Sequence, residues 1–189
     1  MKHPSSRELF AHWTERRGPR PEPERGEIEP AAFRRSLGDA FILGTDFGAE
    51  PSFRLAGTRV CALFGRELRN EAFAALWPAT QQSSVRHLLS LVGGEAAAIV
   101  AGARGRTPEG FATDLELLLL PLRHRGKPGL RMLGVLAPMA VPFWLGSSRL
   151  ESLALGGLRH LGTAVDGAAP SRLAVSARPR LVVHDGGRP

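Results

Sequence analysis

Asp114 and Glu116 are the first residues whose type and spacing could support catalysis. They lie two positions apart in a strand-like segment, so both carboxylates share one face and could work as general acid and base. Because arginines are spread through the whole chain, we expect solvated charges with modest ion pairing instead. Ser147 and Ser148 lack a Gly-x-Ser-x-Gly motif, and residues 102–110 lack the Gly-Lys-Ser/Thr ending of a phosphate-binding loop. The sequence therefore predicts no catalytic machinery, and we do not expect an enzyme.

The histidines and the cysteine that could bind a metal are scattered along the sequence. The six histidines include no pair at i, i+4 spacing, and Cys61 is the only cysteine, so neither a zinc pattern nor an intramolecular disulfide is expected. No apolar run resembling a signal peptide follows Met1, and the longest apolar run, residues 115–122, is far below the roughly 20 residues that cross a bilayer. These features favour a cytoplasmic protein without a membrane span, a metal or a cofactor.

Composition is that of an ordinary globular domain. The 189 residues are 43% apolar and 23% charged, which is enough for one hydrophobic core. The net charge of +7 is not concentrated in one tract, and aromatic residues make up only 6% of the chain, without a tyrosine. This pattern disfavours nucleic-acid binding, which usually gathers its cations on one face and places aromatic side chains among them.

A short amphipathic helix is expected near the N-terminus. Leu9, Phe10 and Trp13 recur at helical spacing within residues 6–17, and the proline-rich stretch 20–25 that follows should be an extended connector. We therefore divide the chain into three parts. These are the helix and connector (1–26), a main domain (27–146) and a partly mobile C-terminal extension (147–189) in which glycine and proline are frequent.

The period of the apolar residues changes twice within the main domain. Two strand-like segments come first, helical spacing follows from residue 58 to 93, and three strand-like segments separated by Gly- and Pro-rich turns complete the domain. This order predicts an α+β fold with one five-stranded antiparallel sheet and the helices of residues 58–93 on one face. The expected strands are 39–45, 52–56, 96–103, 111–122 and 130–137.

The opposite face of this sheet is also apolar and needs a cover. Burying one large apolar side chain is worth about 1.5–3 kcal/mol, so the N-terminal helix can be held there despite its connector. We expect the helix to cover the sheet of its own chain or of a second copy, and thereby to provide the interface of a homodimer. The predicted interface residues are Leu9, Phe10, Trp13, Leu118, Leu120, Leu133 and Val135.

The segment from residue 53 to 68 is similar to the signature of a known family. In it a strand runs into Ala56-Gly57-Thr58 and a helix ends in Phe64-Gly65, which resembles a PAS subfamily of small stand-alone proteins in alphaproteobacteria. The Trp13 helix and the Pro-Phe-Trp-Leu-Gly stretch at 142–146 agree with it. The resemblance implies a PAS fold and a role in sensing or protein interaction, with two-component signalling as its setting.

Two residues invite comparison with cofactor-binding PAS proteins. Some of these hold haem through a helical histidine, but His87 lies beside Arg86 at the polar edge of its expected helix. In light-sensing relatives the flavin-linking cysteine lies in an Asn-Cys-Arg motif on a later helix, and Cys61 has neither that place nor those neighbours. We interpret Cys61 as a buried structural thiol.

The resulting hypothesis is a PAS-type sensory or interaction module without catalysis. It would dock on a signalling protein, with a two-component histidine kinase as one candidate, and would form a homodimer. The alternative is a small-molecule sensor whose pocket lies between the sheet and the helices. A filled hydrophobic core would give the same sequence pattern. The residues expected to line such a pocket are Phe53, Val60, Phe64, Phe73, Trp77 and Leu117.

Overall fold

The computed structural model describes residues 1–45, 49–124 and 129–161. Six strands form one antiparallel sheet in the order β2-β1-β5-β4-β3-β6. The α+β class and the antiparallel sheet predicted from the sequence are confirmed. The strands are β1 (Ala40–Gly44), β2 (Ser52–Ala56), β3 (Ala98–Arg106), β4 (Ala112–Leu122), β5 (Arg131–Pro138) and β6 (Ser152–Leu161).

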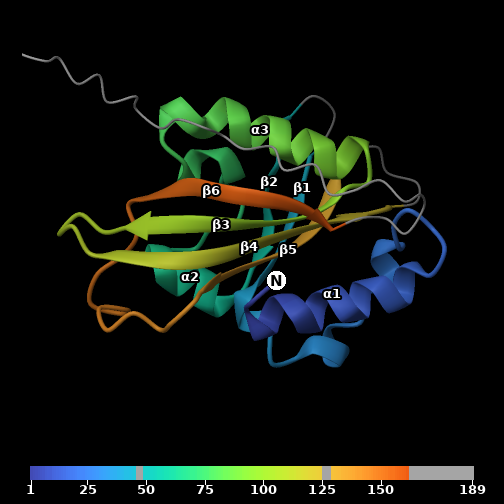
Figure 1. Ribbon diagram of the computed structural model, residues 1–189, viewed down its shortest axis with the longest axis horizontal. Coiled ribbons are helices and arrows are strands. Elements are labelled where there is room, and N and C mark those ends of the chain that lie inside the picture. The colour runs from blue at the N-terminus through green and yellow to red at the C-terminus, as the bar shows by residue number, and fades with distance from the viewer. Residues whose placement is uncertain (46–48, 125–128, 162–189) are drawn as a thin grey trace, which may run out of the picture.

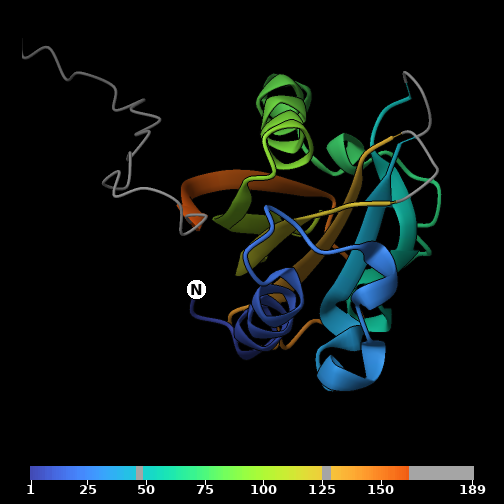
Figure 2. The ribbon, with the colours of Figure 1, turned by 90° about the vertical axis from the view of Figure 1, so that its right-hand side faces the viewer.

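Helices lie on both sides of this sheet. Figure 1 shows α3 on one side of the sheet and α1 on the other, and the view turned by 90° in Figure 2 shows the same arrangement. The α-helices are α1 (Pro4–Arg17), α2 (Thr58–Phe64) and α3 (Ala79–Gly94). The 3₁₀ turns are η1 (Arg25–Glu27), η2 (Pro30–Phe33), η3 (Leu37–Asp39) and η4 (Phe73–Leu76).

The expected number of five strands is wrong, because β6 is a sixth strand at the edge beside β3. It lies in the stretch expected as a C-terminal extension, of which residues 162–189 fall outside the described residues. Gly156 and Gly157 interrupt its apolar alternation and so hide the strand period. At Gly156 the backbone leaves little room for a side chain, since a Cβ there would lie 3.0 Å from the Gly102 carbonyl oxygen, where the β3–β6 register shifts.

The inner core lies between the sheet and helices α2 and α3. It contains the alternate residues Leu115, Leu117 and Leu119 of β4 together with apolar side chains of both helices. Gly134 of β5 shows how closely this core is packed, because a Cβ there would lie 2.2 Å from the ring of Phe41. The period-2 pattern therefore predicted the inner face of β4 correctly.

The outer core lies between the sheet and α1. Leu9 and Trp13 are 0% and 1% exposed and pack with Leu118, Leu120 and Leu133. The Trp13 indole Nε1–H donates a hydrogen bond of 2.8 Å to the Pro121 carbonyl oxygen of β4. In this structure the helix thus covers the outer face of its own sheet.

The connector after α1 follows the sheet closely. Glu24 forms a parallel bridge with Arg123, just beyond the end of β4. The Arg25 amide donates to the Arg123 carbonyl at 2.8 Å, and the Arg123 amide donates to the Pro23 carbonyl at 3.0 Å. These bonds fix the start of the η1–η3 segment beside the outer face.

Truncation of Trp77 should reveal how strongly the inner core depends on its aromatic residues. Trp77 is 2% exposed, so Trp77→Ala should lower the free energy of unfolding by about 3–5 kcal/mol through lost burial and a cavity. The control is Phe143→Ala, because Phe143 is 84% exposed. Urea unfolding of both variants measures the difference, and equal stabilities would contradict the burial of Trp77.

Candidate functional site

The six residues expected to line an inner pocket lie together in the inner core. Phe53, Phe73 and Trp77 form a chain of ring contacts with centroid distances of 5.6 and 6.0 Å. All six side chains are at most 2% exposed and belong to one contiguous cluster, so they pack in the space where such a ligand would lie. Ligand binding by these residues stays a prediction. The six are Phe53, Val60, Phe64, Phe73, Trp77 and Leu117.

The expected interface residues lie in the outer core of a single chain. Six of them are at most 2% exposed, and the seventh, Phe10, is half-buried and stacks on Trp13 with ring centroids 6.0 Å apart. A second copy could reach the buried six only if α1 exchanged between two chains. The buried six are Leu9, Trp13, Leu118, Leu120, Leu133 and Val135.

Asp114 and Glu116 share the outer face of β4 but have different surroundings. Asp114 is exposed, with its Oδ1 atom 3.6 Å from Arg104 Nη1, as expected for a solvated charge. Glu116 is only 7% exposed, which corrects our expectation that it is solvated. Its carboxylate accepts hydrogen bonds from the backbone amides of Lys2 at 2.6 Å and His3 at 3.0 Å. Glu116 therefore holds the start of the chain against the sheet.

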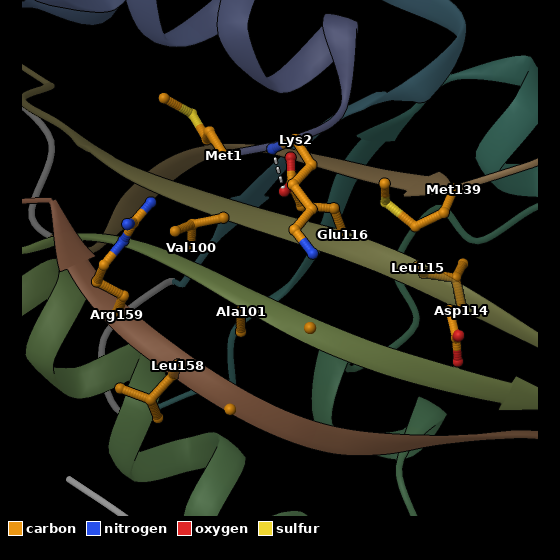
Figure 3. A pocket seen from close by; sticks show the side chains of 12 residues that line it. Met1, Lys2, Val100, Ala101, Asp114, Leu115, Glu116, Met139, Leu158 and Arg159 are labelled. Atoms are coloured by element: carbon orange, nitrogen blue, oxygen red, sulfur yellow. Dashed lines mark hydrogen bonds between the residues drawn. The ribbon is translucent and has the colours of Figure 1, made fainter. Parts of the chain in front are cut away.

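Glu116 also lines a cleft of about 680 Å³ on the outer face (Figure 3). The cleft lies where α1 begins and where β3, β4 and β6 run side by side. Lys2 and Arg159 bring positive charge to its lining, while Asp114 and Glu116 bring negative charge. Because Glu116 already accepts two backbone hydrogen bonds, we assign it a structural role.

The pKa of Glu116 reflects two opposing effects. Burial raises the pKa of its carboxyl group, because the charged form loses solvation. Hydrogen bonds from the Lys2 and His3 amides lower it, as does the positive N-terminal amino group. The hydrogen bonds and the charge prevail, and the pKa lies below the ordinary value for glutamate.

The two residues compared with cofactor ligands have ordinary environments. His87 is exposed on α3, in agreement with the polar edge expected for it. Cys61 is buried, and its Sγ lies 3.9 Å from the Ala56 carbonyl oxygen and 3.8 Å from Glu67 Oε2. Burial raises the pKa of this thiol, with the Glu67 and Glu71 carboxylates adding to the effect, so the reactive thiolate is disfavoured.

Residues 1–45, 49–124 and 129–161 show neither a cluster of metal ligands nor a membrane-spanning helix. In these ranges no three His, Cys, Asp or Glu side chains come together as a metal site would require. Among the helices of the same ranges, none has both the length and the apolar character needed to cross a membrane.

A surface feature that the sequence reading missed lies in the segment after β5. Val141 and Phe143 are 80% and 84% exposed, although the next residue, Trp144, is 3% exposed and belongs to the inner core. Phe143 meets Phe111, which precedes β4, edge to face with ring centroids 5.1 Å apart. The apolar run 139–145 was the available signal, but it does not say which aromatic ring faces outward.

Comparison with known proteins decides the family. A family model described as PAS domain matches residues 1–137, which is most of the chain. The chain belongs to the PAS domain family. The match of this PAS domain begins at the first residue and so includes α1, whereas β6 lies beyond its end. The family consists of sensory and signal-transduction modules, which places this chain in that class.

Among solved structures, this PAS domain is similar to an RNA-binding light-oxygen-voltage receptor. The two chains share 18% identity with a TM-score of 0.42, over 58% of this chain and 33% of the receptor. The PAS domain thus matches about a third of that receptor's length. A search among curated proteins found no match.

Acidification should test the role of Glu116. Because its pKa is lower in the folded than in the unfolded chain, its stabilising contribution is present at neutral pH and is lost as the pH falls below about 4.5. Glu116→Gln places an NH₂ donor near two backbone donors and should cost about 1–3 kcal/mol at neutral pH. The variant should also lose less stability than the wild type on acidification.

Urea unfolding at neutral pH and at about pH 4 measures both effects. The matched control is Asp114→Asn, which removes an exposed carboxylate from the same face of β4. A Glu116→Gln variant that is as stable as this control at both pH values would show that the N-terminal contact contributes nothing.

Proposed function

We propose that this PAS domain signals by docking on a signalling protein, without catalysing a reaction itself. The observation that carries the proposal is an exposed apolar surface, which we call the end patch. It is 41–84% exposed, whereas large apolar side chains of a monomeric protein are mostly buried. The end patch consists of Phe111, Met139, Val141 and Phe143.

The end patch is held in place rather than carried by a loose loop. Trp144 inserts its ring into the inner core directly beside Phe143, and the amides of Leu145 and Ser147 donate to the carbonyls of Pro142 and Trp144. A preordered apolar surface loses little conformational entropy on binding, which favours affinity. The end patch also adjoins the inner core through Trp144, so a rearrangement in that core could alter it.

Charge and family suggest the kind of partner. The chain has a net charge of +7, so a partner surface with an apolar centre and an acidic rim would complement it. The resemblance of residues 53–68 to small stand-alone alphaproteobacterial PAS proteins supports a cytoplasmic two-component histidine kinase as that partner. A homodimer belongs to the same proposal, with exchange of α1 as the route by which the predicted interface residues would meet a second copy.

The docking test compares wild-type protein with the double variant Val141→Ser, Phe143→Ser. Both side chains are at least 80% exposed, so folding should be unaffected. Cross-linking in source-cell extract, followed by mass spectrometry, should identify a histidine kinase with the wild type but not with the double variant. Purified kinase should then bind the wild type at least tenfold more tightly, as expected when about 1.4 kcal/mol of apolar contact is lost.

The matched control is Leu55→Ser, which removes an apolar side chain that is 51% exposed from edge strand β2. If the double variant and this control retain equal kinase binding, the end patch is not the docking surface. Sedimentation velocity on the same samples reports the oligomeric state, and a wild type that stays monomeric at all concentrations contradicts the homodimer.

One observation favours the alternative of a small-molecule sensor. The Trp77 indole Nε1–H is buried and has no hydrogen-bond acceptor among the described residues. An unpaired buried donor costs about 1–3 kcal/mol, and a ligand acceptor in the inner core would remove this cost. Native mass spectrometry of protein purified from its source should then show a stoichiometric bound molecule. A mass equal to that of the protein without a ligand would contradict the sensor alternative and favour the docking proposal.

A further inference from the structure

We propose that the outer face carries a second binding site, for a small amphipathic carboxylic acid. The site is a cleft of about 440 Å³ between the η1–η3 segment and strand β1, on the side of the sheet that α1 also occupies. We call it the outer cleft. It is separate from the inner core, where the sensor alternative would place a ligand, and it does not depend on the docking proposal.

The floor of the outer cleft is a row of apolar side chains across three strands. Ile42 of β1 lies opposite Leu55 of β2 on one side and Leu133 of β5 on the other. Directly opposed residues of antiparallel strands point to the same face, so the three form one continuous surface. Helix α1 covers this row at its β5 end, through Leu9 and Trp13, but leaves its β2 end open.

The wall of the outer cleft is formed by the 3₁₀ turns of the connector. Phe33 of η2 is buried against the outer core, while Leu37 of η3 is 38% exposed and lines the cleft. Across the mouth, Leu55 is 51% exposed. An apolar ligand in the recess would bury part of both leucine side chains. Each Å² of apolar surface removed from water contributes roughly 25 cal/mol to the binding free energy.

Arg25 is the charged residue that lines the outer cleft. Its backbone is fixed by the hydrogen bond to the Arg123 carbonyl, and its side chain is exposed. A guanidinium group binds a carboxylate through paired, charge-assisted hydrogen bonds. The outer cleft therefore offers an apolar recess and one cationic group, without an acidic side chain in its lining.

These features define the ligand class. A volume of about 440 Å³ lies in the range of small-molecule sites, and apolar lining with few polar groups is their usual composition. The complementary molecule has a compact apolar body and one carboxylate, as in a medium-chain fatty acid or an arylalkanoic acid. Its body would lie over Ile42 and Leu133, and its carboxylate would pair with Arg25.

Sodium decanoate and decan-1-ol form a matched pair of probes, because they share the apolar chain and differ in the charged head. Titration of full-length protein below the micelle concentration, followed by calorimetry and amide NMR, should show saturable binding of one decanoate per chain. The amide shifts should centre on residues 25–42 and on Leu55. Decanol should bind about tenfold more weakly, since it lacks the charge-assisted bonds to Arg25.

Three variants test the assignment of the site. Arg25→Gln should weaken decanoate binding about tenfold and leave decanol binding unchanged. Leu55→Trp, at an exposed position, should fill the mouth and weaken both probes. The control Arg69→Gln removes an exposed arginine between α2 and η4 and should change neither. Circular dichroism confirms that each variant is folded.

Several results would overturn the proposal. If neither probe binds saturably to the folded protein, the proposal is wrong. It is also wrong if Arg25→Gln leaves decanoate binding unchanged. Shifts centred on Trp77 and Phe73 would place the ligand in the inner core instead. The chain could instead fail to bind decanoate and sediment as a dimer that dissociates on Leu55→Trp substitution. That result would assign the outer cleft to a second copy of the chain.

Discussion

The structure depends on a sheet whose two faces are both apolar. Strand β4 shows this most clearly, because Leu117 and Leu119 face α2 and α3 while Leu118 and Leu120 face α1. A half-buried antiparallel sheet would expose one of these rows to water, and each exposed leucine would forgo about 1.5–3 kcal/mol. The helix before the main domain is therefore a required layer of the fold, and the family match includes it from the first residue.

The cover on the outer face is held by polar contacts as well as by packing. Trp13 donates to the Pro121 carbonyl, and the Glu116 carboxylate accepts from the Lys2 and His3 amides. The Glu116 contacts hold the residues just before α1, and the Trp13 contact holds the helix itself further along. The connector then turns through η1–η3 beside the sheet, and it leaves the outer cleft at the β2 end of the outer face.

The candidate sites differ in how they relate to this layered core. The end patch is joined to the inner core through Trp144, and the outer cleft is bounded by the outer core through Phe33 and Leu133. The end patch therefore adjoins the inner core, and the outer cleft adjoins the outer core. Within the inner core, the buried Trp77 indole Nε1–H has no hydrogen-bond partner among the described residues, and its ring contacts that of Phe73.

The sequence by itself determined the α+β class, the family, the inner and outer rows of β4 and β5, and the need for a second cover, because each follows from local periodicity or a short motif. It did not show β6, since Gly156 and Gly157 interrupt the apolar alternation of that strand, and the close approach of Gly156 to β3 is visible only in the structure. It also could not say that Glu116 is buried, that Phe143 faces water while Trp144 does not, or that Arg25 meets an apolar recess. Each of these depends on residues distant in sequence, such as Lys2 beside Glu116 or Arg123 beside Arg25, and only the tertiary structure brings them together.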